Sequence, residues 1–396
     1  DYKTTSLFTP SPIMIEQKYV LLLLEWYDYR IHRGVARVAR QHGWQLNCPK
    51  DPITNEGILK GWKGSGCIAL LQCTDTLEYF RSNNIPLVDM GLGDHNLAIP
   101  RVVTDNWEIG RHAAEHFRDQ GYREVFALNT SGVKMYEERL ESISHFMQAG
   151  GGEVTVLESR TMQKEVIDEI RSIAQRRGRK LEELSLGFFA YQDTMAAEMI
   201  SLSRQNNLRV PENIAVLGVD NDDLVNSGLN IELSSVDSDQ EGLGREAANV
   251  LSKLLGNPEH FQSQRIIRHT PKGVVTRQST DCYAVENPLV AKALHWIKNN
   301  YYNGIQASDV AEAMGVTQQG LQKAFSNNHS KSPGQEIRHQ RTLAVSHLLK
   351  TSTANLDTIA KNCGYYSVNS LINSFRSLYG MTPGKYRKEK NGSPEE

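Results

Sequence analysis

The sequence predicts a two-lobed α/β domain followed by an all-α domain that contains two helix-turn-helix units. Between residues 18 and 280, short apolar runs typical of buried strands alternate with stretches of helical periodicity. Such alternation is typical of parallel sheets that are covered by helices on both faces. After residue 288 only helical periodicity remains, and a glycine followed by a capping hydroxyl residue occurs twice, at Gly315 and Thr317 and at Gly364 and Ser367.

The composition is that of an ordinary soluble protein with two or three domains, since the 396 residues are 39% apolar and 23% charged. The longest strongly apolar run, Tyr19–Leu24, is too short to span a membrane, and no signal-peptide pattern opens the chain. We therefore expect a cytoplasmic protein without a membrane partner. The 5 cysteines form no Cys-x-x-Cys pattern, which favours reduced thiols, and we expect neither a metal site nor a cofactor.

Two lobes are expected because about 260 residues of α/β pattern are many for one sheet. Residues 281–287 show no clear period, which is typical of a linker, and Pro288 can open the next helix. The expected segments are an N-terminal tail (1–17), the two-lobed α/β domain (18–280), the linker (281–287), the helical domain (288–390) and a C-terminal tail (391–396).

The elements of the α/β domain follow from the spacing of apolar residues. Tyr19–Leu24 is the first strand, Ile31 and Val35 lie one helical turn apart in the first helix, and Gly43 ends that helix. Further strands are expected at 44–48, 67–71, 86–90, 125–128, 154–157, 186–190 and 214–219. Further helices are expected at 77–81, 106–120, 137–149, 166–177, 194–206 and 241–255, with a glycine turn at 150–152.

Polar residues follow several of these strands, at the carboxyl ends where parallel sheets bind their ligands. Asp28 follows the first strand, Gln192 and Asp193 follow the strand at 186–190, and Asp220 and Asn221 follow the strand at 214–219. Any single acidic residue at such a position more often caps the next helix. If several converge on one crevice, however, their carboxylates and amides suit the hydroxyl groups of a polyhydroxylated ligand.

Each helix-turn-helix unit has a short helix, a glycine turn and a capped second helix. The residues expected to face inward are Val310, Ala311, Met314, Leu321 and Phe325 in the first unit, and Ile359, Ala360, Cys363, Leu371, Ile372, Phe375 and Leu378 in the second. A helix at about 333–349 joins the units and should hold their second helices roughly 34 Å apart, one turn of DNA. An ordinary helical hairpin would show the same spacing of apolar residues.

The second helix of each unit would present its outer face to the DNA major groove. The residues expected to contact double-stranded DNA are Gln318, Gln319, Gln322 and Lys323 in the first unit, and Ser367, Val368, Asn369, Asn373 and Arg376 in the second. Gln and Asn can pair with adenine and Arg with guanine. Residues 284–396 carry 13 Lys and Arg against 8 Asp and Glu, which fits a nucleic acid partner.

The second unit carries a long motif made of Ile359-Ala360, Cys363-Gly364-Tyr365, Ser367, Phe375-Arg376, Tyr379-Gly380, Thr382-Pro383 and Tyr386-Arg387. This motif resembles the signature of the AraC-type transcription regulators, which implies two helix-turn-helix units on one rigid connecting helix. The first recognition helix departs from the family, because Gln318 and Gln319 stand where Arg is more usual. These departures predict an operator with more A·T contacts than is usual.

A second resemblance covers residues 18–280. Val216–Asn221, Ser234–Val236 and Gly273–Thr280 resemble the effector domain of lactose-repressor-type regulators, which is similar to periplasmic sugar-binding proteins. The resemblance implies that Asp220 and Asn221 bind sugar hydroxyls. It also implies that Arg139 and Gln192 are ligand contacts, with Asp193 beside Gln192 often packing structurally.

Tyr27-Asp28 with Gly34-Val35, Thr104-Asp105-Asn106 and Arg277–Asp281 add a closer resemblance, to the regulators of xylose operons. It implies that Tyr27 and Asp28 belong to the ligand site and that xylose is the favoured sugar. It also implies a homodimer, with RNA polymerase as a further candidate partner, and leaves open whether the protein is a transcription activator or a repressor.

Two other functions compete with a sugar-sensing regulator. The first is an enzyme with a DNA-binding tail, which is disfavoured because the sequence has no Gly-rich phosphate loop, Gly-x-Ser-x-Gly, His-Glu-x-x-His or metal-ligand spacing. The second is a regulator that senses a small molecule other than a sugar.

Overall fold

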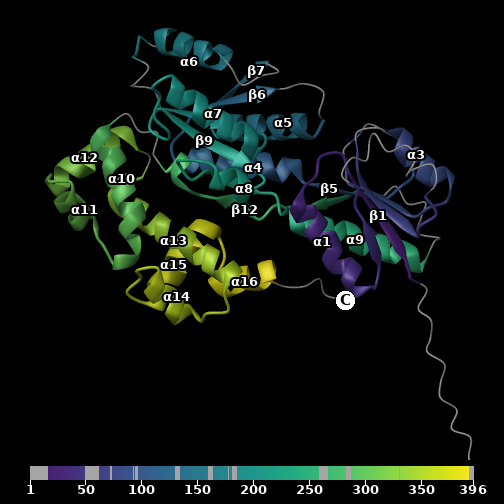
Figure 1. Ribbon diagram of the computed structural model, residues 1–396. Helices are drawn as coiled ribbons and strands as arrows, with labels where there is room; N and C mark the ends of the chain where they lie inside the picture. Colours follow the sequence, from purple (N-terminus) through teal and green to yellow (C-terminus); the bar gives the residue numbers. More distant parts are fainter. Residues whose placement is uncertain are drawn as a thin grey trace, which may run out of the picture.

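The computed structural model contains two α/β lobes and a helical region (Figure 1). It describes residues 17–49, 62–71, 74–91, 93, 97–129, 134–158, 164–176, 178–180, 185–257, 266–281, 287–329 and 331–391. Most of the two predicted tails and of the linker, together with Cys73 and Cys282, lie outside these residues. No helix in the described part of the chain combines the length and the apolar character that crossing a bilayer requires.

The first lobe is a parallel sheet with the strand order β11-β5-β4-β3-β1-β2. Its strands are β1 (Tyr19–Leu24), β2 (Gln45–Asn47), β3 (Gly66–Leu70), β4 (Leu87–Asp89), β5 (Arg101–Thr104) and β11 (Ile266–His269), and its helices are α1 (Tyr29–Gln41), α3 (Thr74–Ser82) and α9 (Gln240–Gly256). Side chains of β1 alternate between two buried cores, with Val20 and Leu22 in the core that includes α1 and α9, and Leu21 and Leu23 in the core that includes α3.

The second lobe is a sheet with the strand order β12-β10-β9-β8-β6-β7. Its strands are β6 (Glu124–Asn129), β7 (Glu153–Glu158), β8 (Leu186–Phe189), β9 (Ile214–Val219), β10 (Ser234–Asp237) and β12 (Gly273–Val275), and its helices are α4 (Asn106–Asp119), α5 (Lys134–Ala149), α6 (Lys164–Arg176), α7 (Asp193–Gln205) and α8 (Asp223–Ser227). The expectation of purely parallel sheets is wrong for β12, which pairs with β10 antiparallel. The link from β11 to β12 is too short for the crossover that a parallel pair needs.

Each predicted strand and helix is present with slightly different ends, but β5, β10, β11, β12 and α8 were not predicted. The two lobes are confirmed, yet neither is one continuous stretch of chain. The chain crosses between them from β5 to α4, from β10 to α9 and from β11 to β12. The crossing segments are hydrogen-bonded to one another, since Asp105 N donates to His269 O (2.9 Å) and Lys272 N donates to Asp237 O (2.8 Å). These three segments form a common hinge.

The helical region holds the two predicted helix-turn-helix units. Its helices are α10 (Pro288–Asn300), α11 (Ala307–Ala313), α12 (Gln318–Asn328), α13 (Pro333–Thr351), α14 (Leu356–Asn362), α15 (Val368–Tyr379) and α16 (Pro383–Asn391). Each unit has its own apolar core, one around Leu321 and Phe325 and the other around Leu371 and Phe375. The single helix α13 contributes to both cores and so fixes the spacing of the units.

The inward position predicted for Leu378 is wrong, because 45% of this residue is exposed. Two tyrosine rings fill the space instead. Tyr379 stacks on Phe375 with ring centroids 4.5 Å apart, and Tyr386 meets the same phenylalanine edge-on at 5.2 Å. The periodicity of α15 could not reveal this, because Tyr386 reaches the core from the following helix α16.

Candidate effector site and nucleic-acid interface

Most of the predicted ligand residues lie at the boundary between the two lobes, where Asp28, Gln192, Asp193, Asp220 and Asn221 follow the carboxyl ends of β1, β8 and β9. Asp28 caps α1, since its Oδ1 accepts hydrogen bonds from the backbone N of Arg30 (2.8 Å) and of Ile31 (3.3 Å). The same carboxylate forms an ion pair with the Arg30 guanidinium at 2.6 Å. The capping role is thus present, and Asp28 also orients the arginine that follows it.

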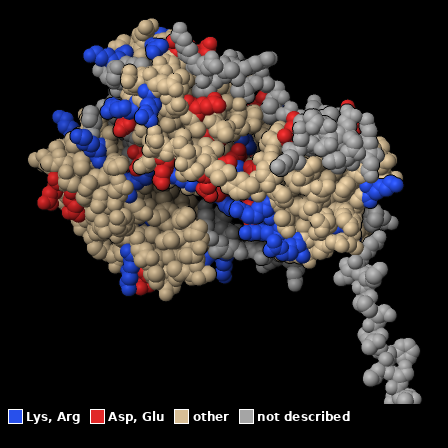
Figure 2. Space-filling view, viewed as in Figure 1, with Lys and Arg blue, Asp and Glu red and all other residues tan. Residues whose placement is uncertain are grey.

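Arg30 connects the two lobes. Its Nη1 donates to the backbone oxygen of Asp220 at 2.5 Å, and its Nη2 lies 3.6 Å from a carboxylate oxygen of Asp222. The residue is 9% exposed, so these contacts are shielded from solvent. Next to it, the exposed Arg33 and Arg37 of α1 form ion pairs with Glu241. Figure 2 shows Lys and Arg side chains gathered on this part of the first lobe, over α1.

Arg139 of α5 is 1% exposed and approaches Asp220 from the second lobe. Its Nε donates to Asn106 Oδ1 at 2.9 Å, and its Nη1 donates to the backbone oxygen of Tyr191. Its Nη2 lies 3.9 Å from Asp220 Oδ1, so the positive charge faces that carboxylate. Asp220 is therefore contacted by Arg30 from one lobe and by Arg139 from the other.

Gln192 joins this cluster through an aromatic pair. The rings of Tyr136 and Tyr191 stack with centroids 3.9 Å apart, and the Tyr136 hydroxyl donates to Gln192 Oε1 at 3.0 Å. The Arg139 guanidinium lies 5.8 Å from the centroid of the Tyr136 ring. Flat aromatic faces beside hydrogen-bonding groups are what a sugar ring needs, because its C–H face is apolar and its hydroxyls are not.

The turn at Asp220 and Asn221 has a strained backbone, with φ of 100° and 49°. Hydrogen bonds hold it in place. Asp220 Oδ1 accepts from Ser238 Oγ (2.8 Å), and Asn221 Oδ1 accepts from Arg277 Nη2 (2.7 Å). Such strain persists only where the surroundings impose it, which is typical of ligand-binding turns.

Asp193 is a buried residue that contacts this turn. It is 3% exposed, and its Oδ2 accepts from the backbone N of Asp222 (2.7 Å) while its Oδ1 accepts from Ser235 Oγ (2.6 Å). Burial and the nearby charge of Asp220 raise the pKa of Asp193 to about 7. A Cβ at Gly218 would lie 2.1 Å from Asp193 Oδ1, so this glycine leaves the room that the carboxylate occupies.

Tyr27 stands apart from the cluster. It is 60% exposed, and its hydroxyl lies 3.0 Å from His32 Nδ1. The sequence reasoning missed Arg30, Asn106 and Tyr136, which link the predicted residues. Signals were present for two of them, since Asn106 stands in the Thr104-Asp105-Asn106 motif and Tyr136 lies one helical turn before Arg139.

The second helices of the two units have the expected capped starts. Thr317 Oγ1 accepts from Gly320 N (3.1 Å) at the start of α12, and Ser367 Oγ accepts from Ser370 N (3.2 Å) at the start of α15. Of the predicted DNA contacts only Val368 is half-buried, against the core of its unit. The exposed ones are Gln318, Gln319, Gln322, Lys323, Ser367, Asn369, Asn373 and Arg376.

The turn of the second unit requires a glycine. Gly364 has a φ of 74°, and a Cβ there would lie 2.4 Å from the backbone oxygen of Tyr301. In the first unit Gly315 also has a positive φ, of 67°, but open space surrounds it. The backbone of the second turn therefore packs directly against the end of α10, which belongs to the first unit.

Comparison with known proteins matches both parts of the chain. Residues 114–280 match the model of the periplasmic binding protein-like domain, and residues 310–389 match a helix-turn-helix domain. The xylose operon regulatory protein of Escherichia coli (strain K12) is 27% identical over 375 residues, which cover 91% of this chain and 94% of that protein. That of Haemophilus influenzae is 24% identical and covers 94% of this chain and 99% of its own.

Solved structures show the same fold. A xylose-binding transcription activator matches with a TM-score of 0.56 and 23% identity, covering 95% of this chain and 99% of its own. A transcriptional regulator in complex with cellobiose matches with a TM-score of 0.55 and 22% identity, over 66% of this chain and 84% of its own.

Proposed function

We propose that this AraC-type transcription regulator, in which a periplasmic-binding-protein-like domain precedes the helix-turn-helix domain, controls carbohydrate genes by binding a sugar between its two lobes. It is a regulator and not an enzyme, as are the proteins that it matches. Pentoses are the proposed effectors, with xylose first, because the relatives that match almost the whole chain are named for the xylose operon.

The observation that carries the sugar proposal is the strained turn at Asp220 and Asn221, placed between Arg30 of one lobe and Arg139 of the other. Carboxylate, amide and guanidinium groups can together donate to and accept from the hydroxyls of a sugar. Asp28 and Gln192 would complete the site, and Asp193 would hold the turn. Tyr27 would contact the ligand only if the lobes move.

A sugar would act by binding one arrangement of the lobes more tightly than another, because only differential affinity can shift such an equilibrium. An ion pair joins the end of the second lobe to the helical region, since Lys298 Nζ of α10 lies 2.6 Å from Asp281. The adjacent Thr280 is held to the second lobe by His116, whose Nε2 lies 2.8 Å from Thr280 Oγ1. A change in lobe angle would therefore reposition the helix-turn-helix units.

DNA recognition would use α12 and α15 in successive major grooves of an operator, about 34 Å apart. We further propose that the chain works in the cytoplasm as a homodimer, with one pair of reading helices from each copy. It would activate transcription, with RNA polymerase as the partner that it recruits.

Calorimetry of the full chain tests the sugar site, with xylose, arabinose, ribose and glucose as ligands and a set of non-sugar metabolites beside them. Asp220→Asn should lower sugar affinity at least tenfold. Asp223→Asn is the matched control, because Asp223 is an exposed carboxylate at the start of the neighbouring α8. Binding of a non-sugar metabolite alone would favour the other regulator hypothesis, and sugar binding that both variants keep would place the site elsewhere.

A further inference from the structure

A network of hydrogen bonds and one ion pair joins the strained turn of the second lobe to the start of the helical region. Its members, in order, are Asn221, Arg277, Ser234, Thr280, Asp281 and Lys298. At the turn, Arg277 Nη2 donates to Asn221 Oδ1 at 2.7 Å, and Arg277 Nη1 donates to the backbone oxygen of Leu233 at 2.7 Å. A sugar hydroxyl that donates to Asn221 Oδ1 would have to share that oxygen with Arg277 or displace it.

A single hydroxyl fixes the backbone of Arg277. Ser234 Oγ accepts from Arg277 N at 2.7 Å and donates to Arg277 O at 2.9 Å. It also accepts from Thr280 Oγ1 at 2.7 Å, so its one hydrogen and both of its lone pairs are used. Ser234 and Thr280 are both 0% exposed, so a bond lost here is not replaced by one to bulk water.

The hydrogens of this network have one consistent arrangement. A carbonyl oxygen can only accept, so the Ser234 hydrogen goes to Arg277 O and the Thr280 hydrogen goes to Ser234 Oγ. His116 Nε2, which lies 2.8 Å from Thr280 Oγ1, is then the donor in that contact. Burial and the nearby charge of Lys298 lower the pKa of His116 to about 3, so the ring is neutral and Nε2 carries its one hydrogen. Such a fully satisfied buried network holds its members rigidly.

The network ends at the helical region. Thr280 is the last residue of the short helix η3 (Gln278–Thr280), and the next residue, Asp281, forms the ion pair with Lys298 of α10 at 2.6 Å. This pair is a direct contact between the second lobe and the helical region, in addition to the covalent linker.

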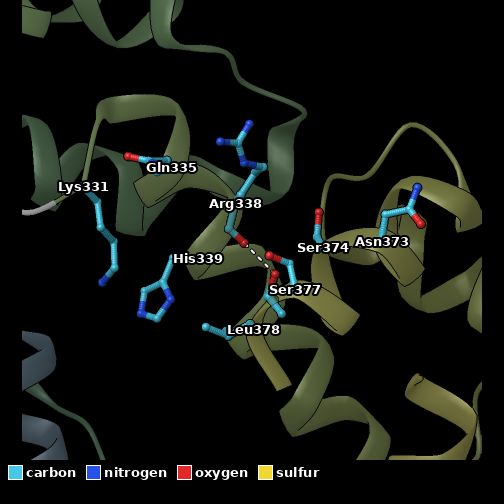
Figure 3. A pocket seen from close by; sticks show the side chains of 9 residues that line it. Lys331, Gln335, Arg338, His339, Asn373, Ser374, Ser377 and Leu378 are labelled. Carbon is cyan, nitrogen blue, oxygen red and sulfur yellow. Dashed lines mark hydrogen bonds between the residues drawn. The ribbon is translucent and has the colours of Figure 1, made fainter. Parts of the chain in front are cut away.

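The position of α10 affects both helix-turn-helix units. Ile297 of α10 shares an apolar core with Phe325 of α12 and Ile337 of α13. In turn, α13 shares the second core with α15, and Arg338 of α13 and Asn373 of α15 line one groove (Figure 3). A shift of α10 therefore acts on both reading helices.

We infer that this network carries sugar occupancy from Asn221 to Lys298 and so to the reading helices. Sugar would bind more tightly when Asn221 Oδ1 is released from Arg277, and the backbone bonds of Arg277 would pass the displacement to Thr280 and the ion pair. Arg277 and Thr280 are thus positioning residues. The inference rests on the proposed function and adds a route within the second lobe to the change in lobe angle.

The test compares the operator affinity of the full chain with and without saturating sugar, using whichever of xylose, arabinose, ribose and glucose the wild-type chain binds. Sugar should change the wild-type affinity by a factor of roughly 5 to 150, which is typical of coupling between two sites. Thr280→Val should bring this factor to about 1, while sugar affinity and operator affinity without sugar each stay within about twofold of wild type. Thr280→Ser keeps the hydroxyl and should restore the factor.

Lys298→Met breaks the network at its other end and decides the question if Thr280→Val does not fold. It should also bring the factor to about 1, and the double variant should add nothing, because two links of one series are not additive. Two controls should keep the wild-type factor. Ser203→Ala removes an equally buried hydroxyl, which donates to Met199 O within α7, and Lys292→Met removes an exposed lysine of α10.

Thermal unfolding verifies that each variant is folded, and calorimetry verifies that it still binds sugar. A wild-type factor in folded Thr280→Val or in Lys298→Met would overturn the inference and leave the proposed function intact. Loss of the factor in Ser203→Ala would also overturn it, because a general loss of stability would then explain the effect. A wild-type chain whose operator affinity changes with none of the sugars would overturn the proposed sugar control, and this inference with it.

Discussion

Arg30 in the first lobe donates a hydrogen bond of 2.5 Å to the backbone oxygen of Asp220 in the second lobe. This contact joins the cap of α1 to the strained turn after β9, so the two lobes meet at the residues that the sequence singles out as ligand contacts. A sugar that enters the boundary has to coexist with this bond or replace it. The presence or loss of this hydrogen bond therefore indicates whether the two lobes are closed or open.

Replacing Arg30 by Met should open the boundary and destabilise the chain by about 3 kcal/mol, because Asp28 and Asp222 would lose a largely buried cation. Denaturant unfolding measures the free energy, and small-angle X-ray scattering measures the opening. Arg33→Met is the control, since Arg33 is 53% exposed and its pair with Glu241 should contribute at most about 1 kcal/mol. Equal effects of the two changes would contradict the bridging role.

Asp193 should make stability depend on pH. Its folded pKa of about 7 lies above the unfolded value near 3.9, so the folded state holds the proton more tightly. This group therefore lowers the free energy of unfolding as pH rises from about 4 to about 7. Asp193→Asn should remove that fall, because the amide keeps an acceptor for Asp222 N without ionising. Unfolding curves at pH 4.5 and 7.5 test this, and an unchanged fall in the variant would count against it.

The stability that the hinge contributes should also depend on pH, over a range set by the pKa of His269. Burial opposes protonation of His269, but Asp239 at 3.2 Å and Glu246 at 2.6 Å outweigh it and raise the pKa of the imidazole. Burial likewise opposes ionisation of Asp239, but His269 and Lys272 outweigh it and lower the pKa of that carboxyl. The stability from His269 is fully present below its unfolded pKa of about 6.5 and is lost as pH rises through the raised folded value.

His269→Gln should therefore destabilise the chain more at pH 5.5 than at pH 8.5. The readout is the difference in free energy of unfolding between the variant and the wild-type chain at each pH, which cancels the contribution of Asp193. His295→Gln serves as the control, because His295 lies on α10 of the helical region, away from the hinge. A constant difference across the two pH values would exclude a charged His269 from the hinge.

Gly364→Ala should destabilise the second helix-turn-helix unit by about 2 kcal/mol or more, because an added Cβ meets a backbone oxygen at a positive φ. Operator binding should fall in parallel. Gly334→Ala should keep or raise stability, since Gly334 lies in the first turn of α13 with open space around it. Thermal unfolding and mobility-shift assays compare the two. A neutral Gly364→Ala would show that the turn is not tied to α10.

The reading face should favour A·T pairs. Asn369→Ala and Gln322→Ala should each reduce discrimination at one adenine by about 1 to 3 kcal/mol, and Arg376→Gln should relax selection at a guanine. Selection of binding sites from random duplexes measures these preferences. Footprints that show protected guanines alone would contradict the prediction.

The helix-turn-helix units were predictable from the sequence because each depends on neighbours within about a dozen residues. The glycine turns, the hydroxyl caps and the inward pairs Leu321 with Phe325 and Leu371 with Phe375 are local patterns, and the structure has them all. The inward position predicted for Leu378 was wrong because the packing there is not local. Rings from both α15 and α16 pack against Phe375 in its place. Strands such as β11 and β12 were missed because their half-exposed residues form no apolar run.

The sequence by itself determined the architecture: alternating strand and helix periods dictate α/β lobes, and two capped glycine turns dictate paired reading helices. Only the tertiary structure decided how the lobes interleave through three crossings, that Arg30 bridges them at Asp220, and that Asp193 contacts the strained turn after β9. The reason is physical. Secondary structure follows from interactions between near neighbours in the chain, whereas a site between lobes depends on contacts such as Arg30 with Asp220, whose residues lie 190 positions apart.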